Sequence, residues 1–230
     1  MKRVSVVFTE HEESGLVKAT GLLAILERIK PKVIFLECPP AAFDNYLSDT
    51  HAKLESTAVN RYRANNSVEL VPVDLPTPPA AFFSNYRDLI ERIARTGPEY
   101  DRFASWHRQY IGAYGFAYLN SAHCSDLFSK RHEAVLTAIA RLADPKLAEC
   151  YDLWNTTNKF RDAAMMTNIE SHCRRASFSR AAFLVGAAHR QSIVDLSGGG
   201  PGTTSSTIQW DFDSFLAEPS LTVERHEEEL

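Results

Sequence analysis

Hydrophobic positions in the first forty residues predict a strand, a helix and a second strand. Residues 3–8 are β-branched or aromatic at most positions, and residues 16–29 carry apolar side chains at helical spacing. Pro31 follows this helix and precedes the short apolar run 32–36. This order predicts two parallel strands joined by a crossover helix.

The pattern then predicts a helix over residues 41–63 and a third strand over 68–73, which ends at Asp74 and the proline-rich residues 75–79. No strand is predicted between residue 80 and about 173, where helical patterns are broken near 96–98, near 112–115 and at Asp144-Pro145. A further strand is predicted at residues 181–185, and an apolar pattern follows it as far as Leu196.

These elements predict an α/β fold with a mainly parallel β-sheet flanked by helices. A long helical section, residues 80–175, separates the N-terminal β-α-β-α-β unit from the C-terminal strand. This section is either a cap over the sheet or the helices of the α/β layers themselves. Residues 197–206 are expected to form a flexible loop, 208–215 a short ordered segment and 224–230 an acidic tail.

Composition favours one soluble globular domain over residues 1–230, because 44% of the residues are hydrophobic and 23% are charged. A chain of this length buries enough surface to fold without a disulfide or a structural metal. The net charge of −4 gives no general attraction to polyanions, so neither nucleic acid nor an anionic membrane is expected as the main partner.

Apolar runs are far shorter than the roughly 20 residues that a membrane span requires. Residues 9–13 are polar where a secretory signal would be apolar, and the four cysteines are scattered without a C-x-x-C pair. Both features predict a cytoplasmic protein with reduced thiols.

Polar residues follow the predicted strands at the edge where parallel sheets bind ligands. They are Thr9, Glu10 and His11 after the first strand, Glu37 and Cys38 after the second, Asp74 after the third, and His189 after the last. Glu37 directly follows a buried run, so its carboxylate would need a metal, a cation or a hydrogen-bond donor. His11 and His189 are candidate metal ligands or general bases, and the alternative is that they cap the next helix.

Four motifs resemble those of the TraB/Tiki, erythromycin esterase and ChaN-like superfamily. Gly186-Ala-Ala-His189 resembles its second GxxH motif, and Val6-Val-Phe-Thr-Glu-His11 resembles the first, with Phe8 in place of glycine. Lys30-Pro-Lys-Val-Ile-Phe-Leu-Glu37 is similar to the segment after the first helix, and Arg161-Asp162-Ala-Ala-Met165 to a helix of the wider superfamily. Residues 41–158 match no motif of this superfamily.

This resemblance implies a metal-dependent hydrolase, peptidase-like or esterase-like, that acts on a small-molecule or peptide substrate. In this hypothesis His11, Glu37 and His189 hold a divalent cation (Mn, Co or Zn), which activates a bound water. Glu10 is then the candidate general base. Arg161 binds a substrate carboxylate or orients Glu37, and Asp162 orients a histidine by accepting its hydrogen bond. Asp74 is expected to contact these residues without touching the metal.

Three alternatives remain open at this point. The same groups act as acids and bases without a metal, or the scaffold binds haem or another small ligand without turnover. The third is a structural or regulatory relative whose site has decayed, which the loss of glycine at Phe8 favours.

Overall fold

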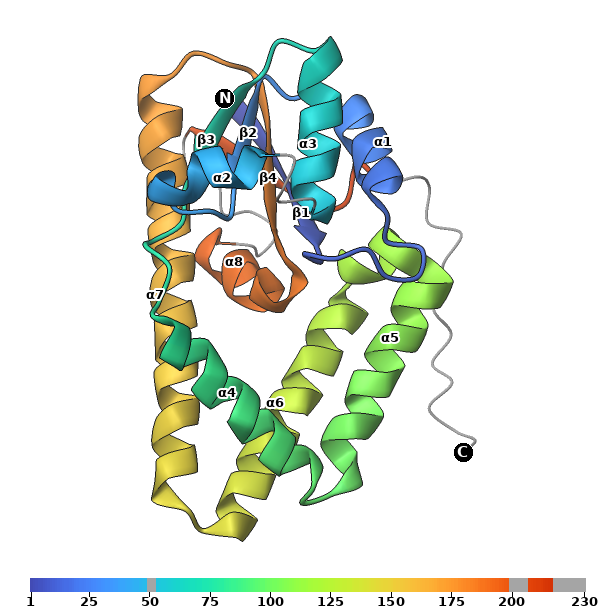
Figure 1. The fold of residues 1–230 in the computed structure, drawn as a ribbon. Helices are drawn as coiled ribbons and strands as arrows, with labels where there is room; N and C mark the ends of the chain where they lie inside the picture. The colour runs from blue at the N-terminus through green and yellow to red at the C-terminus, as the bar shows by residue number, and fades with distance from the viewer. Residues whose placement is uncertain (49–52, 199–206, 217–230) are drawn as a thin grey trace.

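The computed structural model describes residues 1–48, 53–198 and 207–216. Its centre is a five-stranded, all-parallel sheet in the order β3-β2-β4-β1-β5 (Figure 1). The strands are β1 (Lys2–Thr9), β2 (Val33–Leu36), β3 (Glu69–Pro72), β4 (Arg180–Gly186) and β5 (Ile208–Asp211). The predicted α/β fold with a parallel sheet is thereby confirmed. The acidic tail 224–230 and most of the predicted loop 197–206 lie outside the described residues.

The central strands read as continuous apolar runs because both of their faces are covered. Val4, Val6, Val7 and Phe8 of β1 are fully buried, and Phe183 of β4 lies between Val6 and Phe35 in the register. β5 pairs with β1 at one edge, and only the first half of the expected segment 208–215 is strand.

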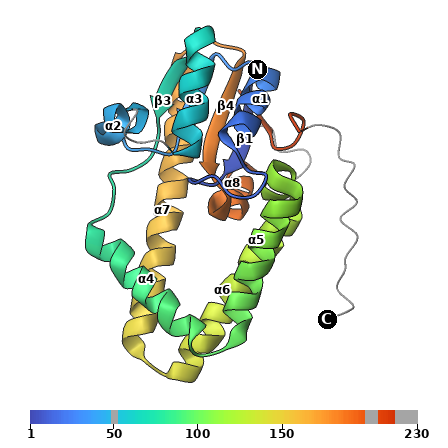
Figure 2. The same ribbon diagram turned by 45° about the vertical axis from the view of Figure 1, so that its right-hand side comes forward.

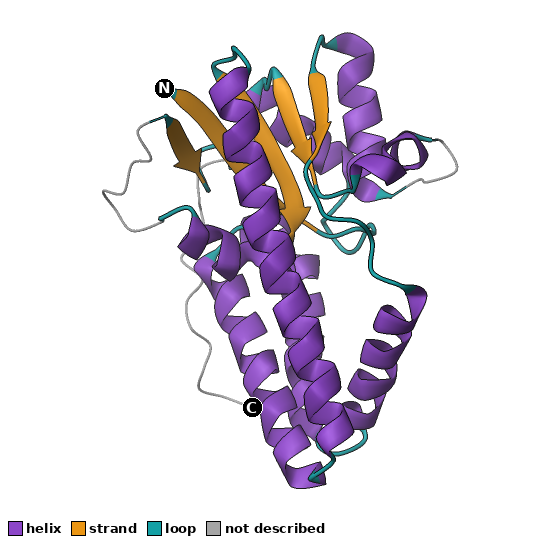
Figure 3. Cartoon of the chain, turned by 90° about the vertical axis from the view of Figure 1, so that its left-hand side faces the viewer, coloured by secondary structure: helices purple, strands orange, loops and turns teal. Residues whose placement is uncertain are grey.

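Helices cover both faces of this sheet. On one side lie α1 (Ala19–Ile29) and α3 (Leu54–Asn65), and on the other lies the C-terminal half of α7 (Pro145–Arg175) (Figures 1 and 3). Two short segments, η2 (Ala187–His189) and α8 (Arg190–Leu196), follow β4.

The single helix predicted over residues 41–63 is wrong. The turn η1 (Pro40–Ala42) leads into α2 (Phe43–Leu47), which ends where Ser48 adopts an extended backbone and its Oγ donates to the Asn45 carbonyl, 2.7 Å away. A separate helix, α3, then begins after Lys53, whose backbone is extended and whose N–H donates to the Ser56 hydroxyl. Hydrogen bonds between side chains and backbone therefore divide the segment.

The helical section both covers the sheet and projects beyond it. The helices α4 (Ala80–Ala94), α5 (Pro98–Leu119) and α6 (Ala122–Leu142), with the first half of α7, extend past the carboxyl ends of the strands (Figures 1 and 2). A second hydrophobic cluster of α4, α6 and α7 residues, among them Leu89, Val135 and Tyr151, stabilises the far end of this projection. Within the described residues, no helix is both long and apolar enough to cross a bilayer.

Two of the three predicted helix breaks are helix starts, at Pro98 and Pro145. The third is a kink within α5, where Gly115 adopts φ 54°. The kink brings the end of α5 to β1, and Asn120 there accepts a hydrogen bond from the Phe8 N–H (2.9 Å) through Oδ1.

Candidate functional site

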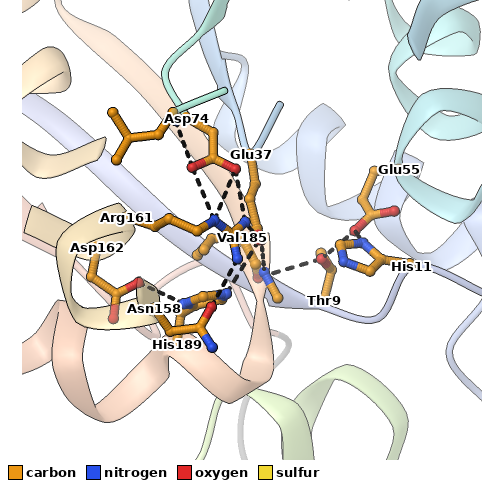
Figure 4. A network of polar contacts seen from close by, with 12 residues as sticks. Thr9, His11, Glu37, Glu55, Asp74, Asn158, Arg161, Asp162, Val185 and His189 are labelled. Atoms are coloured by element: carbon orange, nitrogen blue, oxygen red, sulfur yellow. Dashed lines mark hydrogen bonds and ion pairs between the residues drawn. The ribbon is translucent and has the colours of Figure 1, made fainter. Parts of the chain in front are cut away.

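A buried network of charges lies at the carboxyl ends of β2, β3 and β4, with Glu37 at its centre (Figure 4). The Glu37 N–H donates to the Leu184 carbonyl, so its backbone extends the pairing of β2 with β4 by one residue. Glu37 Oε1 accepts from Arg161 Nη2 at 2.8 Å and faces His189 Nε2 at 3.2 Å. Oε2 accepts from the Gly186 N–H at 2.7 Å. Both carboxylate oxygens are therefore engaged.

Arg161 joins α7 to the ends of β2 and β3. Its Nε and Nη2 bind the Asp74 carboxylate in a fork, with a shortest distance of 2.7 Å. Nη2 also binds Glu37, and Nη1 donates to Asn158 Oδ1 at 2.9 Å. A guanidinium has five N–H donors. Four of them are used in these bonds, and the second N–H of Nη1 has no partner in the part of the chain that the structure describes.

His189 lies in η2, where the turn after Gly186 brings its ring back over Glu37. Its Nδ1 is 2.5 Å from Asp162 Oδ1 and its side chain is only 11% exposed. Burial alone would lower the pKa of this imidazole, but Glu37 and Asp162 outweigh burial and raise the pKa to about 10. His189 is therefore an imidazolium at neutral pH, with both N–H groups donated to carboxylates.

The charges of the network hold Glu37 ionised. Burial would raise the pKa of this carboxyl, yet the positive charges of His189, His11 and Arg161 lower it well below its usual range. Together the network has three carboxylates, of Glu37, Asp74 and Asp162, and two cations, of Arg161 and His189.

His11 lies beside this network and pairs with Glu55, as Figure 4 shows. Nδ1 of His11 is 3.1 Å from Glu55 Oε1, and the same oxygen accepts from Thr9 Oγ1 at 2.8 Å. The His11 side chain is 54% exposed, whereas that of Glu55 is 7% exposed. The hydrogen bond and charge of Glu55 outweigh partial burial and raise the pKa of His11.

Sequence reasoning missed Glu55, because it follows no strand and lies in the segment read as one long helix. A signal was nevertheless present. Glu55 and the apolar residues Ala58, Val59 and Tyr62 recur at helical spacing, and all four are buried. A carboxylate on the apolar face of a helix requires a partner.

Glu10, the expected general base, contacts α5 instead of the network. Its Oε1 is 2.8 Å from His107 Nε2, and His107 Nδ1 is 2.9 Å from the Tyr118 hydroxyl. In an extended segment successive side chains point to opposite sides, which places Thr9 and His11 on the side of Glu55 and Glu10 on the other.

Two of the three expected metal ligands, Glu37 and His189, do not fit a metal ion in this arrangement, and the third, His11, bonds to Glu55 through Nδ1. Glu37 and His189 already use their ligand atoms in bonds to each other, to Arg161, to Gly186 and to Asp162. The guanidinium of Arg161, 2.8 Å from Glu37 Oε1, would repel a cation bound there. Within residues 1–48, 53–198 and 207–216, no three His, Cys, Asp or Glu side chains are grouped as a metal site.

Cys38, which follows β2, is a buried thiol and does not fit the thiolate ligand that a bound haem could take. It is 4% exposed, and burial with the negative charges of Asp74 and Glu37 raises its pKa to about 12.

No model of a known protein family matches this chain, and no curated protein matches its sequence. Among solved structures, a histidine-to-asparagine mutant of erythromycin esterase EreC in its open conformation is similar at 17% identity and a TM-score of 0.36. The similarity covers 80% of this chain and 60% of that one, so this chain spans less than two thirds of that structure. Likeness at this level identifies no family, and the superfamily resemblance stays a prediction.

Proposed function

We propose that this protein is a hydrolase of ester or peptide bonds that uses His11 as its general base. One observation carries the proposal. A half-exposed imidazole is held through Nδ1 by a buried carboxylate, that of Glu55, beside a network that contains two cations. A general base that is oriented by a hydrogen bond to a second group can activate water for attack on a carbonyl.

The proton path follows from the hydrogen bond. Glu55 accepts the N–H of His11 Nδ1, so the neutral ring keeps its lone pair on Nε2. Nε2 takes a proton from water as the water oxygen bonds to the substrate carbonyl carbon. The imidazolium that forms is stabilised by Glu55, and it returns the proton to the leaving group when the carbon–oxygen or carbon–nitrogen bond breaks.

Arg161 supplies positive charge near the reacting carbonyl. Its remaining Nη1 N–H is the donor available to a developing oxyanion or to a substrate carboxylate. His189 has no free N–H, so its role is positional: with Asp162 behind it, it holds Glu37, which in turn fixes Arg161.

The experiment measures kcat/KM for a panel of p-nitrophenyl esters and peptide p-nitroanilides with the wild type, His11→Gln and His132→Gln. His132 is the matched control, since it also bonds through Nδ1 to a buried partner, the Tyr151 hydroxyl, in the projecting helices. We expect His11→Gln to lose about 10²- to 10⁴-fold in kcat/KM and His132→Gln to keep wild-type activity. Equal activity of His11→Gln and wild type would contradict the role of His11.

A metal assay separates the remaining alternatives. We expect hydrolysis to survive dialysis against a chelator. Activity that disappears and returns with Mn, Co or Zn would favour the metal-dependent hydrolase instead. Complete inactivity, with haem or another ligand bound stoichiometrically to the purified protein, would favour the binding protein.

A further inference from the structure

A cavity of about 280 Å³ opens near the amino ends of β1 and β4, the opposite end of the sheet from His11. Its polar lining consists of Arg3, Arg28, Arg180, Ser5, Asp211 and Ser214. Thr9, at the other end of β1, is six residues from Arg3, which corresponds to roughly 20 Å along a strand. This cavity is therefore separate from the candidate active site.

Three arginines from three different elements meet in this cavity. Arg3 of β1 and Arg180 of β4 are register partners in a parallel pair, so their side chains leave the same face of the sheet side by side. Arg28 comes from the last turn of α1. Like charges on paired strand positions repel each other. An arrangement of this kind is stabilised when an anion lies between the charges.

The lining of the cavity neutralises only one of these charges. Asp211 pairs with Arg3 Nε at 3.1 Å and also accepts hydrogen bonds from Ser5 and Ser214. Burial would raise the pKa of Asp211, but these hydrogen bonds and the charge of Arg3 lower it, so Asp211 is ionised at neutral pH.

Among the residues that the structure describes, Arg28 and Arg180 have no carboxylate partner. Arg28 donates to the Phe215 carbonyl at 3.3 Å, and the Arg180 guanidinium has no hydrogen bond or ion pair among the described residues. Three guanidinium groups and one carboxylate leave an excess of two positive charges in the cavity. The chain as a whole has a net charge of −4, so this excess is local.

We propose that this cavity binds the phosphate group of a small phosphomonoester. A phosphate dianion matches the two uncompensated charges, and its oxygens fit the forked N–H donors of arginine. The volume is near the lower end of the range for ligand sites, about 300–1,000 Å³, which favours a compact ligand. The proposal does not depend on the hydrolase activity.

Titration calorimetry with inorganic phosphate at constant ionic strength tests this site, in the full chain and in the variants Arg28→Ala and Arg180→Ala. Arg87→Ala is the matched control, because Arg87 is an exposed arginine of α4 outside the cavity. We expect saturable binding to wild type and a Kd raised at least about tenfold in each cavity variant, which is the effect of losing about 1.4 kcal/mol. Arg87→Ala should bind phosphate within about twofold of wild type.

Sulfate and succinate titrations distinguish phosphate recognition from binding of any dianion. Weaker binding of both would support the phosphate site, whereas equal binding of all three anions would overturn the assignment to phosphate. Lack of saturable binding to wild type, wild-type affinity in both cavity variants, or an equal loss in Arg87→Ala would overturn the site itself. Thermal unfolding of each variant checks that the substitution leaves the fold intact.

Discussion

Replacing Arg161 with methionine should be among the most destabilising single substitutions in the buried network. The variant leaves the Asp74 carboxylate, on a side chain that is 6% exposed, with the Leu75 N–H at 2.7 Å as its remaining hydrogen bond among the described residues. Glu37 keeps His189 and the Gly186 N–H, so most of the loss falls on Asp74. Removal of one partner from a buried ion pair costs about 3–5 kcal/mol of the free energy of unfolding.

Arg92→Met provides the control, because Arg92 also forms a hydrogen-bonded pair with an aspartate, Asp144, at 2.9 Å, but is 52% exposed. Loss of such an exposed pair costs about 0–1 kcal/mol. Urea unfolding followed by circular dichroism measures both variants at pH 7 and at about pH 3. The positive charges of His189, His11 and Arg161 outweigh burial and lower the pKa of Glu37, so its stabilising contribution is fully present above the ordinary carboxyl pKa of 4.5 and is lost only as the pH falls further, towards the folded-state pKa.

The part of the cost of Arg161→Met that comes from Glu37 should therefore be smaller at about pH 3 than at pH 7. A cost no larger than that of Arg92→Met, or a cost independent of pH, would refute the account of the buried network.

Two further predictions concern proton binding and backbone geometry. His189 has a folded-state pKa of about 10 against an ordinary value of 6.5, so its contribution to stability is complete below pH 6.5 and is lost as the pH rises towards 10. Asp162→Asn should lower this pKa and flatten the decline of the urea midpoint between pH 6.5 and 10; an unchanged decline would contradict the assignment. Gly115→Ala should destabilise by more than about 1 kcal/mol, because φ is 54° and the new Cβ would lie 3.0 Å from Leu16 Cβ. Gly112→Ala, whose Cβ would meet nothing within 4 Å, should instead stabilise the helix by up to about 1 kcal/mol, as thermal unfolding of the two variants will show.

Much of the fold was predictable because a parallel sheet buried on both faces requires continuous apolar runs. The run that ends at Leu36 is an example. It predicts β2 and places Glu37 at the carboxyl end of that strand, and the structure confirms this position. Asp74 and His189 follow from the same reasoning, and the structure brings all three together with Arg161.

The partners of these groups were not predictable from strand ends. Thr9 and His11 point to Glu55 and Glu10 points to His107, but alternation in an extended segment gives two opposite sides and does not say which element covers each. Glu55 and His107 are on helices α3 and α5, 44 and 97 residues away from their partners, so tertiary packing decides the pairs.

The pairing of His11 with Glu55 is the central claim, and one comparison tests it most directly. The pKa of His11 is measured by NMR titration of its ring in wild type and Glu55→Gln, together with the pH dependence of kcat/KM for the ester or amide that wild type hydrolyses fastest. The account predicts a His11 pKa above 6.5 in wild type, a lower pKa in Glu55→Gln, and an acid limb of the rate profile that shifts down with it. A His11 pKa that is the same in both proteins, or an acid limb that does not follow it, would contradict the claim.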